Sequence, residues 1–211
     1  MDVTRWLFWN VDTQIDFVYP RGKLYVKGAE DLRQKWKKLT ELARKKSITV
    51  INTADYHFKN SPELDETPDF INTYPEHCMA NSRGADYIKE TDPEDPLIFE
   101  WNKEYLLTQE LFDTTPHRNL IIRKNEFDVF LGNPHTKIIL DFLKPDAAVI
   151  YGVPSKQLIE SILKNLNKKV KQIYIIRDAV KALNGKRLTF NKWGKSGVGI
   201  IELNDLKKLL H

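Results

Sequence analysis

The sequence predicts an α/β fold built on a mainly parallel sheet. Short apolar runs alternate with amphipathic segments along the chain, as strands joined by crossover helices do. The 211 residues are 41% hydrophobic and 11% aromatic, enough for one substantial core and too few to argue for two. No apolar run approaches the length of a membrane span. We therefore expect a single domain over residues 1–211 that does not enter a membrane.

The first half of the chain is expected to form three strands and one long helix. A nearly continuous apolar run predicts a strand at 5–11, and apolar residues at helical spacing predict a helix at about 28–45. Further strands are predicted at 47–54 and 97–101. The segment 57–96 between them is expected to be irregular, and a loop of that length is typical of functional regions.

The second half continues the alternation of strand and helix. The pattern predicts strands at 118–124, 147–152 and 170–178, and helices at 136–144 and 156–167. Residues 197–210 predict a short strand and a last helix, for which Asn204 is the expected N-cap.

Composition excludes several classes of protein. The net charge of +4 combines 33 basic with 29 acidic residues, and the densest basic stretch also carries a helical apolar stripe, so nucleic-acid binding is not expected. The start of the chain does not have the pattern of a signal peptide, which favours a cytoplasmic protein. Cys78 is the only cysteine, so no internal disulfide can form.

The first candidate group follows the first strand. Asp12 leaves that strand, with Gln14, Asp16 and Phe17 after it. A carboxylate at the end of a buried strand is partly desolvated and can act as a general acid or base. The simpler alternative is that Asp12 or Asp16 caps a turn, which is a routine use of aspartate.

The second candidate group has the composition of a metal site. Asp55 and His57 are two residues apart just after a strand, so their side chains point to the same side in extended backbone. With His77, and with Glu63 as a fourth ligand, they offer the nitrogen and oxygen atoms that suit Zn, Fe or Mn. A loop histidine is more often only solvated or hydrogen-bonded. That is how we interpret His117, His135 and His211.

The third candidate is a lysine at the end of another predicted strand. Most lysines are solvated, and this chain has many. Lys124, however, lies at the carboxyl end of a parallel strand, where it could pair with Asp12 and lower the pKa of that carboxylate or orient its proton.

Four segments together resemble the isochorismatase and nicotinamidase superfamily, also called the cysteine hydrolases. They are VDTQIDF, ADYHF with TPDFINTYPEHCMANSRGAD, KNEFDVF, and AVIYGVPSKQL with IIRDAV, in matching order across nearly the whole chain. The resemblance implies a Rossmann-like, open six-stranded parallel sheet with helices on both faces, and a homo-oligomer. It also implies a small-molecule ligand.

The resemblance further assigns roles to individual residues. It implies that Asp12 and Lys124 belong to an Asp-Lys-Cys triad. It places a divalent metal (Zn, Mn or Fe) on Asp55, His57 and His77, with Glu63 where relatives have another histidine. Phe17 and Tyr74 match aromatic residues that enclose a substrate ring, although ordinary packing explains a single aromatic residue equally well.

Two departures from the family pattern affect covalent catalysis. Leu158 stands where the family has its nucleophilic cysteine, and an alkyl side chain cannot form a thioester. Pro154 removes a backbone N–H that the family uses in its oxyanion hole, although an X-Pro bond would suit the family's cis peptide there. Ser155 is expected to be a helix N-cap rather than a substitute nucleophile. Cys78 matches a second family cysteine and is interpreted as structural.

Three functional hypotheses remain open at this stage. The first is a protein that binds a metal and a small aromatic or carboxylate ligand but has lost amidase chemistry. The second is a hydrolase without a cysteine, which uses a metal-activated water or cleaves an ether with Asp12 and Lys124. The third is an interaction protein in which these residues are incidental.

Overall fold

Seven strands form one open, all-parallel sheet in the computed structural model, which describes residues 4–113, 119–183 and 188–210. The order across the sheet is β3-β4-β2-β1-β5-β6-β7. The strands are β1 (Trp6–Val11), β2 (Thr49–Asp55), β3 (Leu97–Phe99), β4 (Asn119–Lys124), β5 (Ala147–Gly152), β6 (Gln172–Val180) and β7 (Gly199–Ile201).

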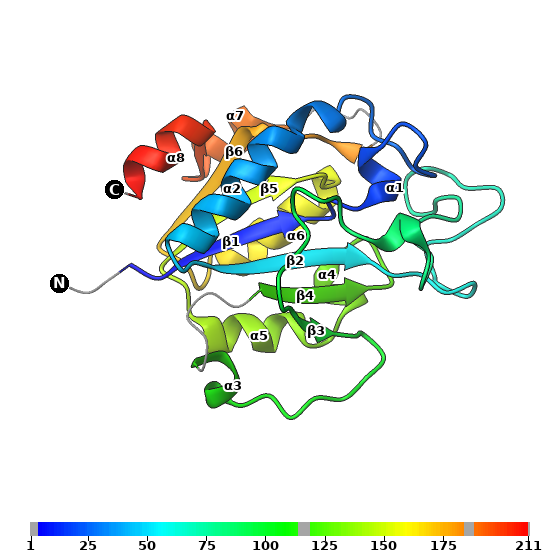
Figure 1. The fold of residues 1–211 in the computed structure, drawn as a ribbon, viewed down its shortest axis with the longest axis horizontal. Helices are drawn as coiled ribbons and strands as arrows, with labels where there is room; N and C mark the ends of the chain where they lie inside the picture. Colours follow the sequence, from blue (N-terminus) through cyan, green and yellow to red (C-terminus); the bar gives the residue numbers. More distant parts are fainter. Residues whose placement is uncertain (1–3, 114–118, 184–187, 211) are drawn as a thin grey trace.

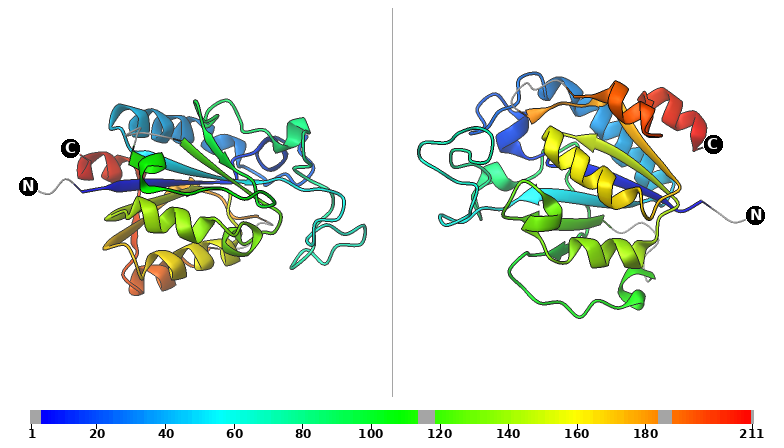
Figure 2. Two further views of the ribbon diagram at one scale, coloured as in Figure 1. Left: turned by 90° about the horizontal axis from the view of Figure 1, so that it is seen from below. Right: turned by 180° about the vertical axis from the view of Figure 1, so that it is seen from behind.

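Helices cover both faces of this sheet. The longest, α2, lies on one face, while α5 and α6 lie on the other (Figures 1 and 2). The α-helices are α1 (Ile15–Val18), α2 (Arg33–Lys45), α3 (Gln109–Asp113), α4 (Val129–Gly132), α5 (Thr136–Leu143), α6 (Lys156–Leu166), α7 (Phe190–Lys195) and α8 (Leu203–Leu209), with short 3-10 helices η1 (Glu30–Leu32) and η2 (Arg83–Ala85). None of the helices in the described part of the chain combines the length and the apolar character that crossing a membrane requires.

The central strand β1 is where the winding of the sheet reverses. The chain moves from β1 to β2 on one side, and later returns to place β5 on the other side. In open α/β sheets the crevice outside the carboxyl ends of the strands at such a point is the usual ligand site. The residues at or just beyond the ends of β1, β2, β4 and β5 therefore meet in one place.

The predicted alternation is confirmed, with one correction to the sheet. The six strands implied by the family resemblance are one too few, because β7 pairs with β6 and extends that edge. Gly199 pairs with Tyr174, and a Cβ on Gly199 would lie 2.5 Å from the Tyr174 ring. A glycine is therefore what allows the seventh strand to approach.

The other differences lie in helix ends and short helices. Asn204 is not the N-cap of the last helix, because Glu202 and Asp205 form a capping box that starts α8 two residues earlier. The short helices α1, α3, α4 and α7 were not predicted, since each has only 4 to 6 residues and gives little periodic signal.

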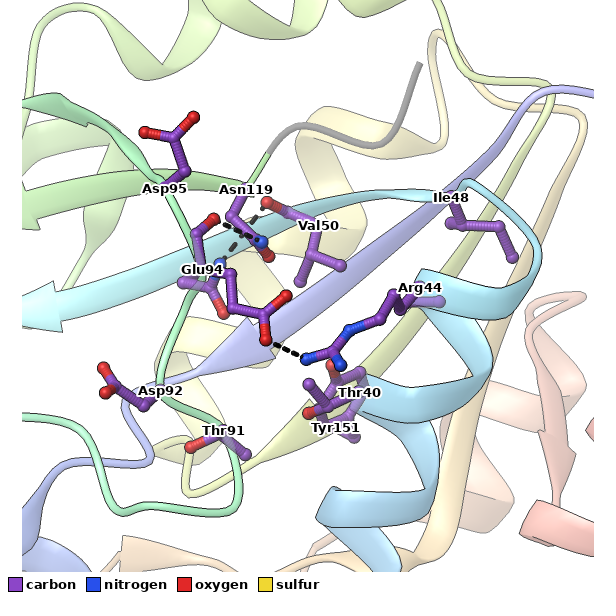
Figure 3. A pocket seen from close by; sticks show the side chains of 12 residues that line it. Thr40, Arg44, Ile48, Val50, Thr91, Asp92, Glu94, Asp95, Asn119 and Tyr151 are labelled. Carbon is purple, nitrogen blue, oxygen red and sulfur yellow. Dashed lines mark hydrogen bonds and ion pairs between the residues drawn. The ribbon is translucent and has the colours of Figure 1, made fainter. Parts of the chain in front are cut away.

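A hollow remains on the α2 face of the sheet. The segment that leads to β3 passes beside α2 without closing the space between them, and Figure 3 shows the side chains that line this space. It shares no lining residue with the cavity at the carboxyl ends of the strands.

Candidate functional site

Lys124 lies buried between two carboxylates at the strand ends. Its Nζ is 3.2 Å from Asp12 Oδ2 and also contacts Asp55 Oδ1. Asp55 and Lys124 are paired across β2 and β4, so the register of the sheet sets this contact. Asp12 follows β1 in a left-handed conformation (φ 48°), which aspartate tolerates better than most residues. Its Oδ1 accepts a 2.7 Å hydrogen bond from the hydroxyl of Thr53.

The two carboxylates differ in their ionisation. Burial raises the pKa of Asp12, Lys124 opposes that rise, and the resulting pKa is about 6. Burial acts on Asp55 too, but Lys124 and the nearby imidazoles outweigh it and hold the Asp55 pKa well below its usual range. Burial lowers the pKa of Lys124, yet the neighbouring carboxylates raise it overall, so this amine stays charged. Asp12 is thus the group that can exchange a proton near neutral pH.

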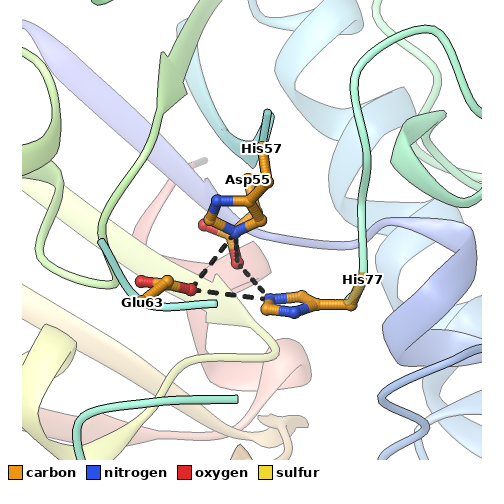
Figure 4. Close-up of side chains that lie close together, drawn as sticks. All are labelled: Asp55, His57, Glu63 and His77. Carbon is orange, nitrogen blue, oxygen red and sulfur yellow. Dashed lines mark ion pairs between the residues drawn. The ribbon is translucent and has the colours of Figure 1, made fainter. Parts of the chain in front are cut away.

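Four buried side chains, one of which is Asp55, form a compact cluster next to Lys124. Asp55 ends β2, His57 follows it, and Glu63 and His77 come from the long loop (Figure 4). His57 Nε2 is 3.2 Å from Glu63 Oε1 and 3.9 Å from Asp55 Oδ2. His77 Nε2 is 3.4 Å from Asp55 Oδ2 and 3.5 Å from Glu63 Oε1. The two oxygens of Asp55 therefore face different partners, Lys124 on one side and the histidines on the other.

These separations match those of a tetrahedral metal site. Ligands at zinc bond lengths lie roughly 3.3 to 3.5 Å from one another in a tetrahedron. The four measured distances bracket this value, and all four ligand atoms lie within 4.8 Å of one another. Two imidazoles and two carboxylates are a donor set suited to Zn, Mn or Fe.

Unpartnered polar atoms in the cluster also fit a metal. Among the described residues, both ring nitrogens of His57 and Glu63 Oε2 are buried without a hydrogen bond. His57 Nε2 is close to Glu63, but not in hydrogen-bond geometry. Such groups are rare in protein interiors. His77 Nδ1 lies 2.8 Å from the carbonyl oxygen of Pro75, to which it must donate, so Nε2 keeps its lone pair for a metal.

The raised pKa of His57 indicates that a proton occupies the cluster when no cation is bound. Burial lowers this pKa, but the carboxylates of Asp55 and Glu63 outweigh burial and raise it to about 9. The metal-free cluster therefore holds a proton on His57 at neutral pH, and a metal that binds there must displace it.

Two further polar residues of the first motif fix the backbone of the site. Gln14 Nε2 donates to the carbonyl of Asp55, and Gln14 Oε1 accepts from the Asp55 N–H, both at 2.8 Å. Asp16 accepts from the N–H of Cys78 at 2.7 Å and of Lys23 at 3.0 Å. Asp16 thus holds turns together, as the simpler interpretation of it expected, whereas Asp12 faces Lys124 and does not.

A small cavity separates the cluster from the start of α6. Its volume is about 10 Å³, room for a single water. Phe17 and Tyr74 line it and pack against His77, with ring centroids 5.4 and 6.1 Å from the imidazole. The residues that line it are Asp12, Phe17, Asp55, Glu63, Tyr74, His77, Lys124, Phe127, Val153, Ser155, Leu158 and Leu183.

Apolar and capping groups occupy the β5 side of the cavity. Leu158 is 1% exposed and lines the wall. Its backbone N–H donates to Ser155 Oγ at 3.0 Å, which confirms Ser155 as the N-cap of α6. The Val153 N–H donates to the Val11 carbonyl at 2.7 Å. Pro154 has no N–H, is buried outside the lining, and follows a trans peptide bond.

Cys78 does not lie at the cavity. It is fully buried, its Sγ is 3.7 Å from the carbonyl oxygen of Gly84, and it is absent from the cavity lining. Burial raises the pKa of its thiol well above the usual range, so the thiol stays protonated.

The sequence patterns left several neighbours of the site unidentified. Phe127 and Leu183 line the cavity from separate segments, and Thr53 binds Asp12. No spacing in the sequence points to Phe127 or Leu183, whereas Thr53 could have been found from the pairing of adjacent strand ends. Of the histidines interpreted as outside any site, His135 lies 2.7 Å from the Lys103 carbonyl through Nε2. His117 and His211 lie outside the described residues.

Comparisons with known proteins agree on one family. The Isochorismatase domain family matches residues 7–194. A pyrazinamidase of Pyrococcus horikoshii, solved in complex with zinc, superposes with a TM-score of 0.70 at 22% identity, covering 94% of this chain and 99% of that one. An isochorismatase family protein from Desulfovibrio vulgaris gives a TM-score of 0.72 at 16% identity, covering 99% of both chains. A nicotinamidase from Acinetobacter baumanii gives a TM-score of 0.68 at 17% identity, covering 98% of this chain and 100% of that one. No curated protein matches the chain.

Proposed function

Because this chain belongs to the isochorismatase domain family, we propose that it binds a divalent metal and a small ligand without the family's covalent cysteine chemistry. The observation that carries the proposal is the spacing of Asp55, His57, Glu63 and His77, which suits a tetrahedral metal, beside a cavity that no thiol lines. That a similar fold from Pyrococcus horikoshii was solved with zinc supports a metal here.

A bound cation would supply Lewis-acid chemistry, polarising a water or carbonyl group. The chain's own residues would do the rest. Lys124 stays charged and orients Asp12, and Asp12 can hold or release a proton near neutral pH. His77 is oriented by the Pro75 carbonyl toward the cluster.

The size of the cavity limits the ligand. About 10 Å³ does not admit an aromatic ring. A small aromatic or carboxylate ligand would therefore enter only when Tyr74 or Phe17 moves aside. Three features after β5 support the loss of amidase chemistry. Leu158 stands where the family has its nucleophilic thiol, so no covalent intermediate can form there. Pro154 has no N–H, and the Leu158 N–H is already bonded to Ser155, so neither can donate to an oxyanion.

Calorimetric titration of the chelator-treated protein with zinc tests the metal half of the proposal. We expect one zinc per chain and proton release on binding, visible as a dependence of the heat on the buffer. A His57→Ala variant should lose this binding, while His135→Ala, which removes a histidine outside the cluster, should keep it. Equal titrations for all three proteins would refute the site.

A second candidate function is hydrolysis without a cysteine. It is favoured by one observation: Asp12, Lys124 and three residues of the metal cluster line the same water-sized cavity. Ammonia release from nicotinamide and pyruvate release from isochorismate, each with zinc, manganese or iron and with Asp12→Ala as the control, test this candidate. Turnover that disappears in the control would establish it and show that the protein is an enzyme.

From the family resemblance we also propose that the protein forms a homo-oligomer. Light scattering on the purified protein measures the mass in solution against the 24.7 kDa of one chain.

A further inference from the structure

The hollow on the α2 face has a sheet floor and two walls (Figure 3). Val50 and Asn52 of β2 and Tyr151 of β5 lie at its base, and α2 and the segment 91–95 enclose it. Its volume is about 190 Å³. An apolar cavity of about 150 Å³ is known to hold a benzene molecule. The hollow therefore has room for one six-membered ring with a small substituent.

Tyr151 brings an unused hydrogen-bonding group to this hollow. Its side chain is 1% exposed, and its ring packs edge-on against Phe8 with centroids 6.1 Å apart. Within the described part of the chain, its hydroxyl has no hydrogen-bond partner, and this oxygen is not among the fully buried unpartnered atoms, so it is accessible to a small molecule. Burial raises the pKa of Tyr151, so the hydroxyl remains a donor.

The charged side chains around the hollow are either paired across it or point outward. Arg44 of α2 and Glu94 form an ion pair across it, and Asn119 Nδ2 holds the Glu94 carbonyl at 3.0 Å. The carboxylates of Asp92 and Asp95 point outward in Figure 3. Because Arg44 is paired with Glu94 and the two aspartates point outward, a charged ligand would find no free counter-charge aimed into the hollow, while Ala43, Ile48 and Val50 offer apolar contact.

We propose that this hollow binds a small uncharged molecule with a single-ring apolar body and one polar group that hydrogen-bonds to Tyr151. The size of the hollow, the absence of a free charge aimed into it, and the Tyr151 hydroxyl without a partner among the described residues all agree with this class of ligand. The site is independent of the metal cluster, since the two cavities share no lining residue.

Benzyl alcohol and toluene are a suitable pair of probes, because they share a ring and differ in the hydroxyl. Titrated into the ¹⁵N-labelled protein, each should give saturable shifts of the backbone amides of residues 40–44, 91, 92, 94 and 95. In Tyr151→Phe, benzyl alcohol should bind roughly three- to tenfold more weakly, while toluene should bind as before. This variant should fold, since it removes a hydroxyl that has no partner among the described residues.

A second variant tests the space itself. Ala43→Leu places a larger side chain in the hollow and should abolish binding of both probes, with an otherwise native amide spectrum. Absence of saturation in the wild type, shifts confined to residues around Phe17 and Tyr74, or unchanged benzyl alcohol binding by Tyr151→Phe would each overturn the proposal.

Discussion

The two sides of the candidate site face the same cavity with opposite chemistry. The ends of β2 and β4 present Asp55 and Lys124, which join the metal cluster to Asp12 through buried charges. The start of α6, which follows β5, presents Leu158 and the N-cap residue Ser155. One side carries a donor set suited to a cation beside a carboxylate of raised pKa, and the other presents a leucine and a serine that caps a helix.

This difference means that substitutions on the two sides have different energetic costs. A buried network of charges is costly to interrupt, because each member left alone is an unpaired charge or an unsatisfied donor. A cysteine at the start of a helix can be replaced by leucine without that penalty, since Leu158 packs with Ile162 on the buried face of α6. The predictions below test the two sides separately.

The largest effect is expected from Lys124→Met. The variant leaves the Asp12 and Asp55 carboxylates buried without their shared cation, and the free energy of unfolding should fall by about 3 to 5 kcal/mol. Urea unfolding measures this loss. The control Lys169→Met removes a lysine from an ion pair with the exposed Asp141 and should cost about 1 kcal/mol or less. Equal losses in the two variants would show that the buried network does not contribute as described.

The pH dependence of stability should reveal the raised pKa of Asp12. The folded pKa is about 6 and the unfolded pKa 3.8, so the folded protein holds the extra proton between these values. The free energy of unfolding of metal-free protein should therefore fall, by up to about 3 kcal/mol, as the pH rises through this window.

Comparison with Asp12→Asn isolates this contribution, because all other titrating groups are shared. Urea unfolding across the window should show the wild type losing stability relative to the variant as the pH rises. A relative gain would mean that Lys124 dominates over burial and that the pKa of Asp12 is lowered.

Removal of one metal ligand should weaken zinc binding strongly. His77→Ala takes away one of four ligands, and the zinc affinity should fall roughly a hundredfold or more, as measured by competition with a chelating dye. The Leu158→Ala variant, on the opposite side of the cavity, should keep its affinity within a few-fold. Comparable losses in both would mean that the two sides are not independent.

The smallest effect is expected at the helix cap. Ser155→Ala removes the hydrogen bond to the Leu158 N–H, which should lower the free energy of unfolding by about 1 kcal/mol and leave zinc affinity unchanged. Thermal unfolding with and without zinc measures both quantities. A large loss of zinc affinity would contradict a capping role.

Much of this arrangement could be predicted because strand ends are visible in the sequence. Asp12, Asp55 and Lys124 each follow an apolar run, and parallel pairing brings such ends together. The Ser155 cap was predicted from its place before an apolar helical stripe.

Other features depend on packing that no local pattern records. Glu63 and His77 come from a long loop, so their residue types and the family resemblance pointed to a common site, but no local pattern places their side chains together. The closure of the cavity and the unpartnered hydroxyl of Tyr151 result from how distant side chains fit together. Asn204 was the wrong cap because the reciprocal pair of Glu202 and Asp205 competes for the same helix start.

The most direct test of the account is to measure zinc content and ammonia release from nicotinamide in one sample of purified protein. The account predicts about one zinc per chain, because the four ligands of the cluster are in place. It also predicts no ammonia above that of an Asp12→Ala control. Failure to retain zinc would contradict the metal site, and turnover that depends on Asp12 would contradict the loss of amidase chemistry.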